Sequence, residues 1–362
     1  MSRQRTPASA ARGRILSIDA IRGLAILMMF YSHGLHWFFT GTSHDIATIF
    51  GVNSIGDMAT PMFYTISGIA LYLSLTSSKK EQAEPAALHR LYAGKFAQLF
   101  LIGVLLSKSW GVLQAQAVSL WILARIFVSL KARRPLQGTM GVAPTVGVAA
   151  LLSHHLIVSS VPPHHFLAGI LRGEFPLFAI LAVNAFGLYV GHQLRARGTG
   201  GWTGIAGAAL AGAGLLLHHW IQPIERADMS LSFITFGIGL VMLLLNILEL
   251  PAWRDSRLLA PFVDAGRDTL FLFVGHYLVF FLPLYALGFI NSFGRPVALV
   301  LSALFTLTMV RIAYWRKSLG ITARDTLDWV FGSQPTPPAL EENLSRLTLA
   351  YYQSIPMDPH PW

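Results

Sequence analysis

The chain has 362 residues, of which 54% are hydrophobic and only 12% are charged. Charged residues make up about a quarter of an ordinary soluble domain, so this composition excludes a soluble globular protein. The formal net charge of +10 is divided among several short gaps between apolar stretches, and we therefore expect no nucleic acid partner. No cysteine occurs, which excludes disulfide bonds and thiolate chemistry.

Ten apolar stretches follow one another, each of roughly the length that crosses about 30 Å of hydrocarbon as a helix. We expect them over residues 16–39, 58–75, 91–106, 112–130, 142–161, 175–192, 202–221, 231–250, 269–290 and 297–314. The sequence therefore predicts an all-α, polytopic membrane helix bundle of about ten transmembrane helices over residues 1–320. Residues 321–362 contain several prolines and are predicted to form a cytoplasmic C-terminal tail.

The basic residues between the stretches predict the orientation of the chain. The first stretch follows a basic segment and is too long for the core of a signal peptide, so we expect it to remain as a helix. Every second gap is rich in lysine and arginine, and positive loops stay in the cytoplasm. The other gaps hold only Lys108, Arg172, Arg226 and Arg295. Both termini are therefore predicted to be cytoplasmic, and we expect a bacterial inner membrane protein.

The first stretch carries three ionisable residues, Asp19, Arg22 and His33. Charges inside a membrane helix are costly, so they are candidates for function. At about 100° per residue the three fall within an arc of about 60°, with His33 about 16 Å beyond Arg22 along the axis. This arrangement fits a conduit through the membrane. The structural alternative is an ion pair of Asp19 with Arg22 at the boundary and a histidine that only bonds a neighbouring helix.

Four further polar residues lie in or beside the predicted spans: Asp57, Ser67, Arg267 and His276. For each of them a structural hydrogen bond between helices is as good an explanation as a functional role. The histidines show no spacing typical of a metal site, so we expect no metal.

Five short motifs occur between residue 14 and about residue 290. They read Arg14-x-x-Ser17-x-Asp19-x-x-Arg22-Gly23 running on to His33; Asp57-x-x-x-Pro61-x-Phe63 with Ser67-Gly68; Trp110-Gly111-Val112-Leu113-Gln114; Glu174-Phe175-Pro176-Leu177-Phe178; and Gly266-Arg267-Asp268-Thr269-Leu270 running on to His276. The ordered set resembles the transmembrane acyltransferase superfamily, which includes the acyltransferase-3 proteins, and most closely its heparan-α-glucosaminide N-acetyltransferase-like branch. The family often has a Pro-Trp pair after the fourth motif, where this chain has Ala179, Ile180 and Leu181.

The resemblance implies an acyltransferase that moves an acetyl or other short acyl group from cytoplasmic acyl-CoA to a hydroxyl or amine. Acetyl-CoA or another acyl-CoA would be a co-substrate, with no permanently bound cofactor. The acceptor would be a glycan, a lipid-linked sugar or a small molecule, in contact with membrane lipid, and the sequence allows a homodimer. Arg14, Arg22 and Arg267 would bind the donor's phosphates, with Asp19 orienting Arg22.

Two histidines compete for the role of catalytic base under this resemblance. His33 is the first choice, and His44 in the first outer loop is the alternative, because the family has a loop histidine implicated in transfer. Either histidine could instead carry the acyl group in a two-step mechanism. Asp57, Ser67 and His276 would be supporting residues.

Two other functions compete with an acyltransferase. Buried arginine, aspartate and histidine also mark substrate paths in transporters, so a transporter or flippase of a lipid-linked or acidic solute is the main alternative. A protein without chemistry, serving as a partner in an envelope assembly, is the second.

Overall fold

The computed structural model describes residues 15–40, 55–107, 110–133, 136–162, 165, 167–226 and 229–318. Within these ranges the chain is helical and contains no strand, apart from an isolated bridge between Phe39 and Phe293. Two predicted site residues, Arg14 and His44, lie outside the described residues. The predicted boundary after residue 320 and the predicted tail of residues 321–362 lie outside them as well.

Ten long helical segments in the described part of the chain coincide with the ten predicted spans. They are α1 (Leu16–Phe38), α2 (Ala59–Leu75), α4 (Pro85–Leu106), α5 (Val112–Lys131), α6 (Val142–Ser160), α8 (Leu177–Arg197), α9 (Gly201–Trp220), α10 (Leu231–Leu248), the segment from α13 to α14 (Thr269–Ala286) and α15 (Arg295–Ser318). Eight of the ten, all but α1 and α4, are long and apolar enough by composition alone to cross a membrane. The prediction of an all-α membrane helix bundle is confirmed.

Short helices connect the long ones. They are α3 (Ser78–Glu81), α7 (Ala168–Leu171), α11 (Pro251–Arg254) and α12 (Ala260–Arg267), together with 3-10 turns at Ile55–Met58, Leu136–Thr139 and Arg257–Leu259. The helix α12 is the one that matters for the site, because it packs against α1.

The ninth predicted span is not one regular helix. It consists of α13 (Thr269–His276), a π-helix at Tyr277–Phe281 and α14 (Leu282–Ala286). Pro283 lies two residues beyond the π-helix and has no N–H to donate to the carbonyl of Val279, which favours a wider turn just before it. Such π-turns inside α-helices are often found at functional sites.

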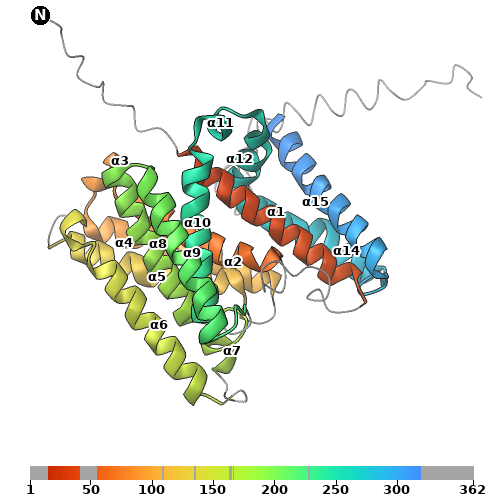
Figure 1. Cartoon of the computed structure of the whole chain (residues 1–362), viewed down its shortest axis with the longest axis horizontal. Coiled ribbons are helices and arrows are strands. Elements are labelled where there is room, and N and C mark those ends of the chain that lie inside the picture. The colour runs from red at the N-terminus through yellow and green to blue at the C-terminus, as the bar shows by residue number, and fades with distance from the viewer. Residues whose placement is uncertain are drawn as a thin grey trace, which may run out of the picture.

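The helix α1 runs between α10 on one side and α12 and α15 on the other (Figure 1). On the α10 side, α2 packs against α8 through their backbones. A Cβ atom added to Gly68 would lie 2.1 Å from the carbonyl oxygen of Asn184, and one added to Gly187 would lie 2.2 Å from that of Thr65. Close contact through small residues is the usual way in which helices associate in a bilayer, where no hydrophobic effect drives them together.

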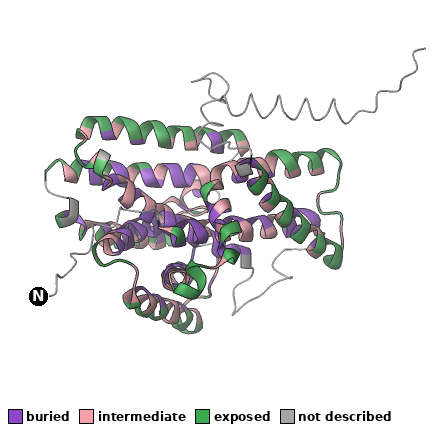
Figure 2. Cartoon of the chain, turned by 90° about the horizontal axis from the view of Figure 1, so that it is seen from above, coloured by how far each residue is buried: buried purple, intermediate pink, exposed green. Residues whose placement is uncertain are grey.

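Many residues of the peripheral helices are exposed, as the green segments of Figure 2 show, and a number of them are large and apolar. Examples are Leu156 on α6, Ile205 on α9 and Leu307 on α15, whose exposed fractions are 67%, 75% and 64%. In a bilayer these surfaces face hydrocarbon. The polar residues of interest lie inward from this apolar surface, around α1.

Candidate active site

The first polar cluster lies where α12 packs against the beginning of α1. Asp19 is buried, and its carboxylate holds two arginines. Arg22 Nη1 lies 3.6 Å from Asp19 Oδ1, and Arg267 Nε lies 3.8 Å from Asp19 Oδ2. The structure therefore brings together Arg22 and Arg267, predicted to bind the donor, and Asp19, predicted to orient Arg22.

Two glycines allow this cluster to form. A Cβ atom on Gly23 would lie 1.7 Å from the carbonyl oxygen of Phe262, and one on Gly266 would lie 1.8 Å from that of Asp19. No side chain fits at either position, so the backbones of α1 and α12 touch. This contact gives a physical reason for the Arg-Gly and Gly-Arg pairs of the first and fifth motifs: each glycine sets the position of the arginine beside it.

Both arginines of this cluster keep surface that a ligand can reach. The side chain of Arg22 is 24% exposed and that of Arg267 is 40% exposed. Their distances to Asp19 are longer than those of a good hydrogen bond. A guanidinium group has five N–H donors and binds phosphate oxygens in pairs, so the two side chains can hold Asp19 and an anionic ligand together.

The neighbouring residue Asp268 fastens α15 to the same region. Its Oδ1 atom lies 3.2 Å from Nη1 of Arg316, and the guanidinium of Arg316 lies 4.2 Å from the centre of the Phe271 ring. Arg316 is buried, so this ion pair fixes the far end of α15 against the beginning of α13.

The second polar cluster is a pair of histidines deep in the bundle. His33 on α1 and His276 at the end of α13 lie close together, with 3.0 Å between Nδ1 of His33 and Nε2 of His276. His276 has no exposed surface, whereas His33 is only partly buried. The accessible member of the pair is therefore His33.

The hydrogen bonds determine which ring nitrogens carry protons in the neutral pair. Nδ1 of His276 bonds the carbonyl oxygen of Phe273, and a carbonyl only accepts, so this nitrogen is protonated. Nε2 of His276 then has the lone pair that accepts from Nδ1–H of His33. Nε2 of a neutral His33 is left unprotonated, which is the state that a general base requires.

Aromatic rings surround the histidine pair. The indole of Trp37 stacks on His276 with 5.5 Å between ring centres and 13° between planes. Phe30 and Tyr277 lie 5.3 Å and 4.4 Å from the same ring, measured between centres. Tyr277 is the first residue of the π-helix, so the irregular turn builds one wall of the site. The walls exclude water from His276 and hold both rings in place.

A third polar cluster is centred on Arg226, in the segment between α9 and α10. Its Nε atom lies 3.0 Å from Asp57 Oδ1, and its Nη2 atom lies 3.5 Å from Glu174 Oε1. Arg226 is also near enough to His33 to act on it electrostatically. Asp57 is therefore an ion-pair partner of Arg226, and through that arginine it can support His33.

The third and fourth sequence motifs meet beside this cluster. Nε1 of Trp110 donates a hydrogen bond to the carbonyl oxygen of Phe175, at 2.8 Å. Because Phe175 follows Glu174 in the chain, the indole fixes the backbone that carries Glu174 to Arg226. These motif residues position charges rather than contact the histidines.

Tyr64 on α2 adds a buried hydroxyl group to the Arg226 region. The residue is 1% exposed, and its Oη atom has no hydrogen-bond partner among the described residues. Arg226 lies within electrostatic range of this group. A buried hydroxyl without a partner is costly, so this one is suited to bond a buried water molecule.

One predicted supporting residue does not join these clusters. Ser67 is partly buried on α2 and makes no side-chain hydrogen bond with the described part of the chain. No group of three or more possible metal ligands occurs within the described ranges.

Sequence reasoning missed Arg226, Trp37 and Tyr277 as parts of the site. Arg226 had given a signal, because it is one of the few basic residues in gaps that are otherwise poor in positive charge. The two aromatic residues gave none, since aromatic side chains are common near membrane surfaces whatever the function.

The fold and these clusters define an integral membrane protein with a polar site inside an α-helical bundle. The family model of the heparan-alpha-glucosaminide N-acetyltransferase catalytic domain matches residues 14–204, more than half of the chain. The chain therefore belongs to this family of membrane acetyltransferases, as the motifs predicted. No curated protein matches the chain. The matched range includes Asp19, Arg22 and His33, while Arg226, Arg267 and His276 lie beyond it.

Proposed function

We propose that this protein transfers an acetyl or other short acyl group from cytoplasmic acyl-CoA to a hydroxyl or amine of a sugar-like acceptor at the opposite face of a bacterial inner membrane. The observation that carries the proposal is the hydrogen-bonded pair of His33 and His276, of which His33 is accessible. Membership of the acetyltransferase family supports it.

The donor would bind at the first polar cluster. Arg22 and Arg267 present accessible guanidinium groups around Asp19, and guanidinium groups bind phosphates through paired hydrogen bonds. His33 lies eleven residues after Arg22 on the same helix, which is about 16 Å along the axis. The thioester arm of the donor has to cover this distance to bring its carbonyl carbon to the histidine pair.

The histidine pair would then act on the acceptor. Nε2 of His33 takes the proton of the acceptor's hydroxyl or amine as its oxygen or nitrogen attacks the thioester carbonyl carbon. The carbon–sulfur bond breaks, and the leaving thiolate takes the proton back from the imidazolium of His33, giving free CoA thiol. His276 would be a positioning residue, since its bonds to Phe273 and His33 fix the proton arrangement of the reacting ring.

The third cluster would bind the polar part of the acceptor. The charge of Arg226 acts on both His33 and Tyr64, and its guanidinium is held by Asp57 and Glu174. The carboxylate of Glu174, whose side chain is 68% exposed, can bond the hydroxyl groups of a sugar. The orientation predicted from the loops puts this cluster on the outer side.

His44 is the other candidate for the base, and kinetics with two variants separate the two assignments. If His33 is the base, His33→Ala loses most of the transfer activity in a folded protein that still binds the donor, while His44→Ala remains active. Full activity of His33→Ala with loss in His44→Ala would reverse the assignment. Trapping of an acylated protein would show the two-step route, in which a histidine carries the acyl group.

The test of the proposed function itself is calorimetric titration of the purified protein with acetyl-CoA, repeated with Arg22→Ala. We expect binding in the wild type and weaker binding in the variant. Equal affinities would remove Arg22 from the donor site. No binding of acetyl-CoA or longer acyl-CoA to a folded protein would contradict the proposal and favour a transporter.

A further inference from the structure

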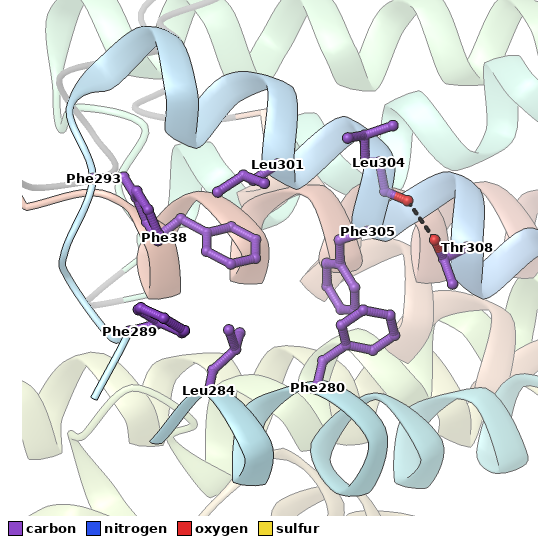
Figure 3. Close-up of a pocket in the computed structure, with 9 residues that line it drawn as sticks. All are labelled: Phe38, Phe280, Leu284, Phe289, Phe293, Leu301, Leu304, Phe305 and Thr308. Carbon is purple, nitrogen blue, oxygen red and sulfur yellow. Dashed lines mark hydrogen bonds between the residues drawn. The ribbon is translucent and has the colours of Figure 1, made fainter. Parts of the chain in front are cut away.

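An apolar cavity of about 330 Å³ lies beside the histidine pair, between the end of α1, the π-helix with α14, and α15. Its lining residues are Phe38, Phe280, Leu284, Phe289, Phe293, Leu301, Leu304, Phe305 and Thr308. Figure 3 shows Phe280 and Leu284 pointing into it from one side and Leu301 and Phe305 from the other. The hydroxyl of Thr308 donates to the carbonyl of Leu304, so the lining offers no free polar side chain.

The cavity shares a wall with the candidate active site. The ring of Phe305 lines the cavity and also lies 5.7 Å from the rings of Trp37 and Phe30, both of which contact His276. The π-helix has the same double role. Its Phe280 lines the cavity, while its Tyr277 stands against the histidines. A ligand in the cavity would therefore be separated from the histidine pair by a single layer of aromatic rings.

The helices around the cavity are open to the bilayer. Leu278, Leu282 and Leu307 on these helices are exposed, at 53%, 51% and 64%. The surrounding solvent of such side chains in a membrane is hydrocarbon. A water molecule needs two to four polar partners, which this lining does not offer. The chemistry of the lining, the aromatic wall that it shares with the active site and its access to lipid together select a hydrocarbon chain as the occupant.

We infer that the acceptor is lipid-linked and that its hydrocarbon chain occupies this cavity while its polar head reaches His33. The inference rests on the proposed acyl transfer and narrows the acceptor to one class: a sugar or similar head on a long alkyl or isoprenoid chain. Burial of the chain supplies affinity in proportion to apolar area. A water-soluble acceptor with the same head would lack that affinity.

The test compares two acceptors in protein reconstituted into nanodiscs: dodecyl glucosaminide and methyl glucosaminide, each with acetyl-CoA. The variant Leu284→Trp fills the cavity with a larger side chain. Leu282→Trp is the matched control, because Leu282 lies two residues away on α14, is exposed to lipid and does not line the cavity. A dodecyl glucosaminide with a diazirine on its chain reports binding without any reaction.

We expect the wild type to have an apparent KM for the dodecyl acceptor about tenfold or more below that for the methyl acceptor. Leu284→Trp should remove this difference and leave donor binding and transfer to methyl glucosaminide unchanged, while Leu282→Trp behaves like wild type. Photolabelling should fall on the segments that contain Leu284 and Leu301. Leu301→Trp, from the opposite wall, should give the same loss.

Two results would overturn the inference while the proposed function stands: equal KM values for the two acceptors in the wild type, or an undiminished preference for the dodecyl acceptor in both cavity variants. If no acceptor is acetylated but the chain probe labels the cavity in competition with dodecyl glucosaminide, the proposed transfer fails and the binding site remains. Labelling spread evenly over lipid-facing helices would refute the binding site itself.

Discussion

The glycine contact between α1 and α12 makes a prediction that tests how the donor cluster is built. In Gly266→Ala the new methyl group would lie 1.8 Å from the carbonyl oxygen of Asp19, whereas ordinary contact begins near 3.4 Å. The backbone of α12 would have to retreat by about 1.6 Å. Because Arg267 Nε is already 3.8 Å from Asp19 Oδ2, such a shift breaks this ion pair and moves one of the two proposed phosphate-binding groups.

We expect two measurable effects of Gly266→Ala. Overpacking of a close contact typically costs about 1–3 kcal/mol, so the midpoint of thermal unfolding should fall. Loss of one charged hydrogen bond to a phosphate is worth about 1.5–3 kcal/mol, so calorimetry should show a Kd for acetyl-CoA raised by about ten- to a hundredfold.

A matched control for Gly266→Ala is Gly212→Ala on α9, where a Cβ atom would have no neighbour within 4 Å. This variant should keep the donor affinity of the wild type, and its unfolding midpoint should not fall, because alanine favours a helix over glycine. If Gly266→Ala also behaves like wild type in both measurements, the backbone contact does not position the arginines and the reasoning is refuted.

Three further predictions concern the histidines, the buried ion pair and the orientation. His33→Ala should lower kcat by about 10²–10⁴-fold, and His276→Ala should lower it by less, while the affinity for the donor stays unchanged in both variants. If His276→Ala is as active as the wild type, His276 has no positioning role. Arg226→Ala should lower the free energy of unfolding by about 3 kcal/mol, because it removes the ion pair that compensates the buried carboxylate of Asp57 at 3.0 Å. Asp57→Asn in the same chain should restore part of this loss in chemical denaturation, and no recovery would argue against the pair. A cysteine at Ala196, exposed at the end of α8, should react with an impermeant thiol reagent only from the cytoplasmic side, and labelling from outside would reverse the orientation.

The choice of Ala196 for labelling depends on the backbone. The neighbouring Gly198 is equally exposed but has φ of 71° and ψ of −177°, a conformation that is almost restricted to glycine. A cysteine there would strain the turn between α8 and α9, whereas Ala196 lies in regular helix.

The sequence by itself showed that this protein lies in a lipid bilayer, and it showed how many long helices the chain forms. Apolar runs of membrane-spanning length depend on local composition alone, so the predicted spans agree with the long helices to within a few residues at most ends. The shared face of Asp19, Arg22 and His33 was also predictable, because the angular period of a helix is fixed. The π-turn before Pro283 was not, because a proline inside a helix can be accommodated in several ways.

Only the tertiary structure decided which polar residues meet. His33 and His276 are separated by nearly the whole helical domain, and their pairing follows from the packing of α13 beside α1. The partner of Asp57 is Arg226 for the same reason. Lipid-facing and protein-facing apolar residues look alike in sequence, so helix neighbours cannot be read from hydropathy. The position of α12 on α1 is fixed instead by the backbone contacts at Gly23 and Gly266. These contacts therefore also fix the positions of Arg22 and Arg267.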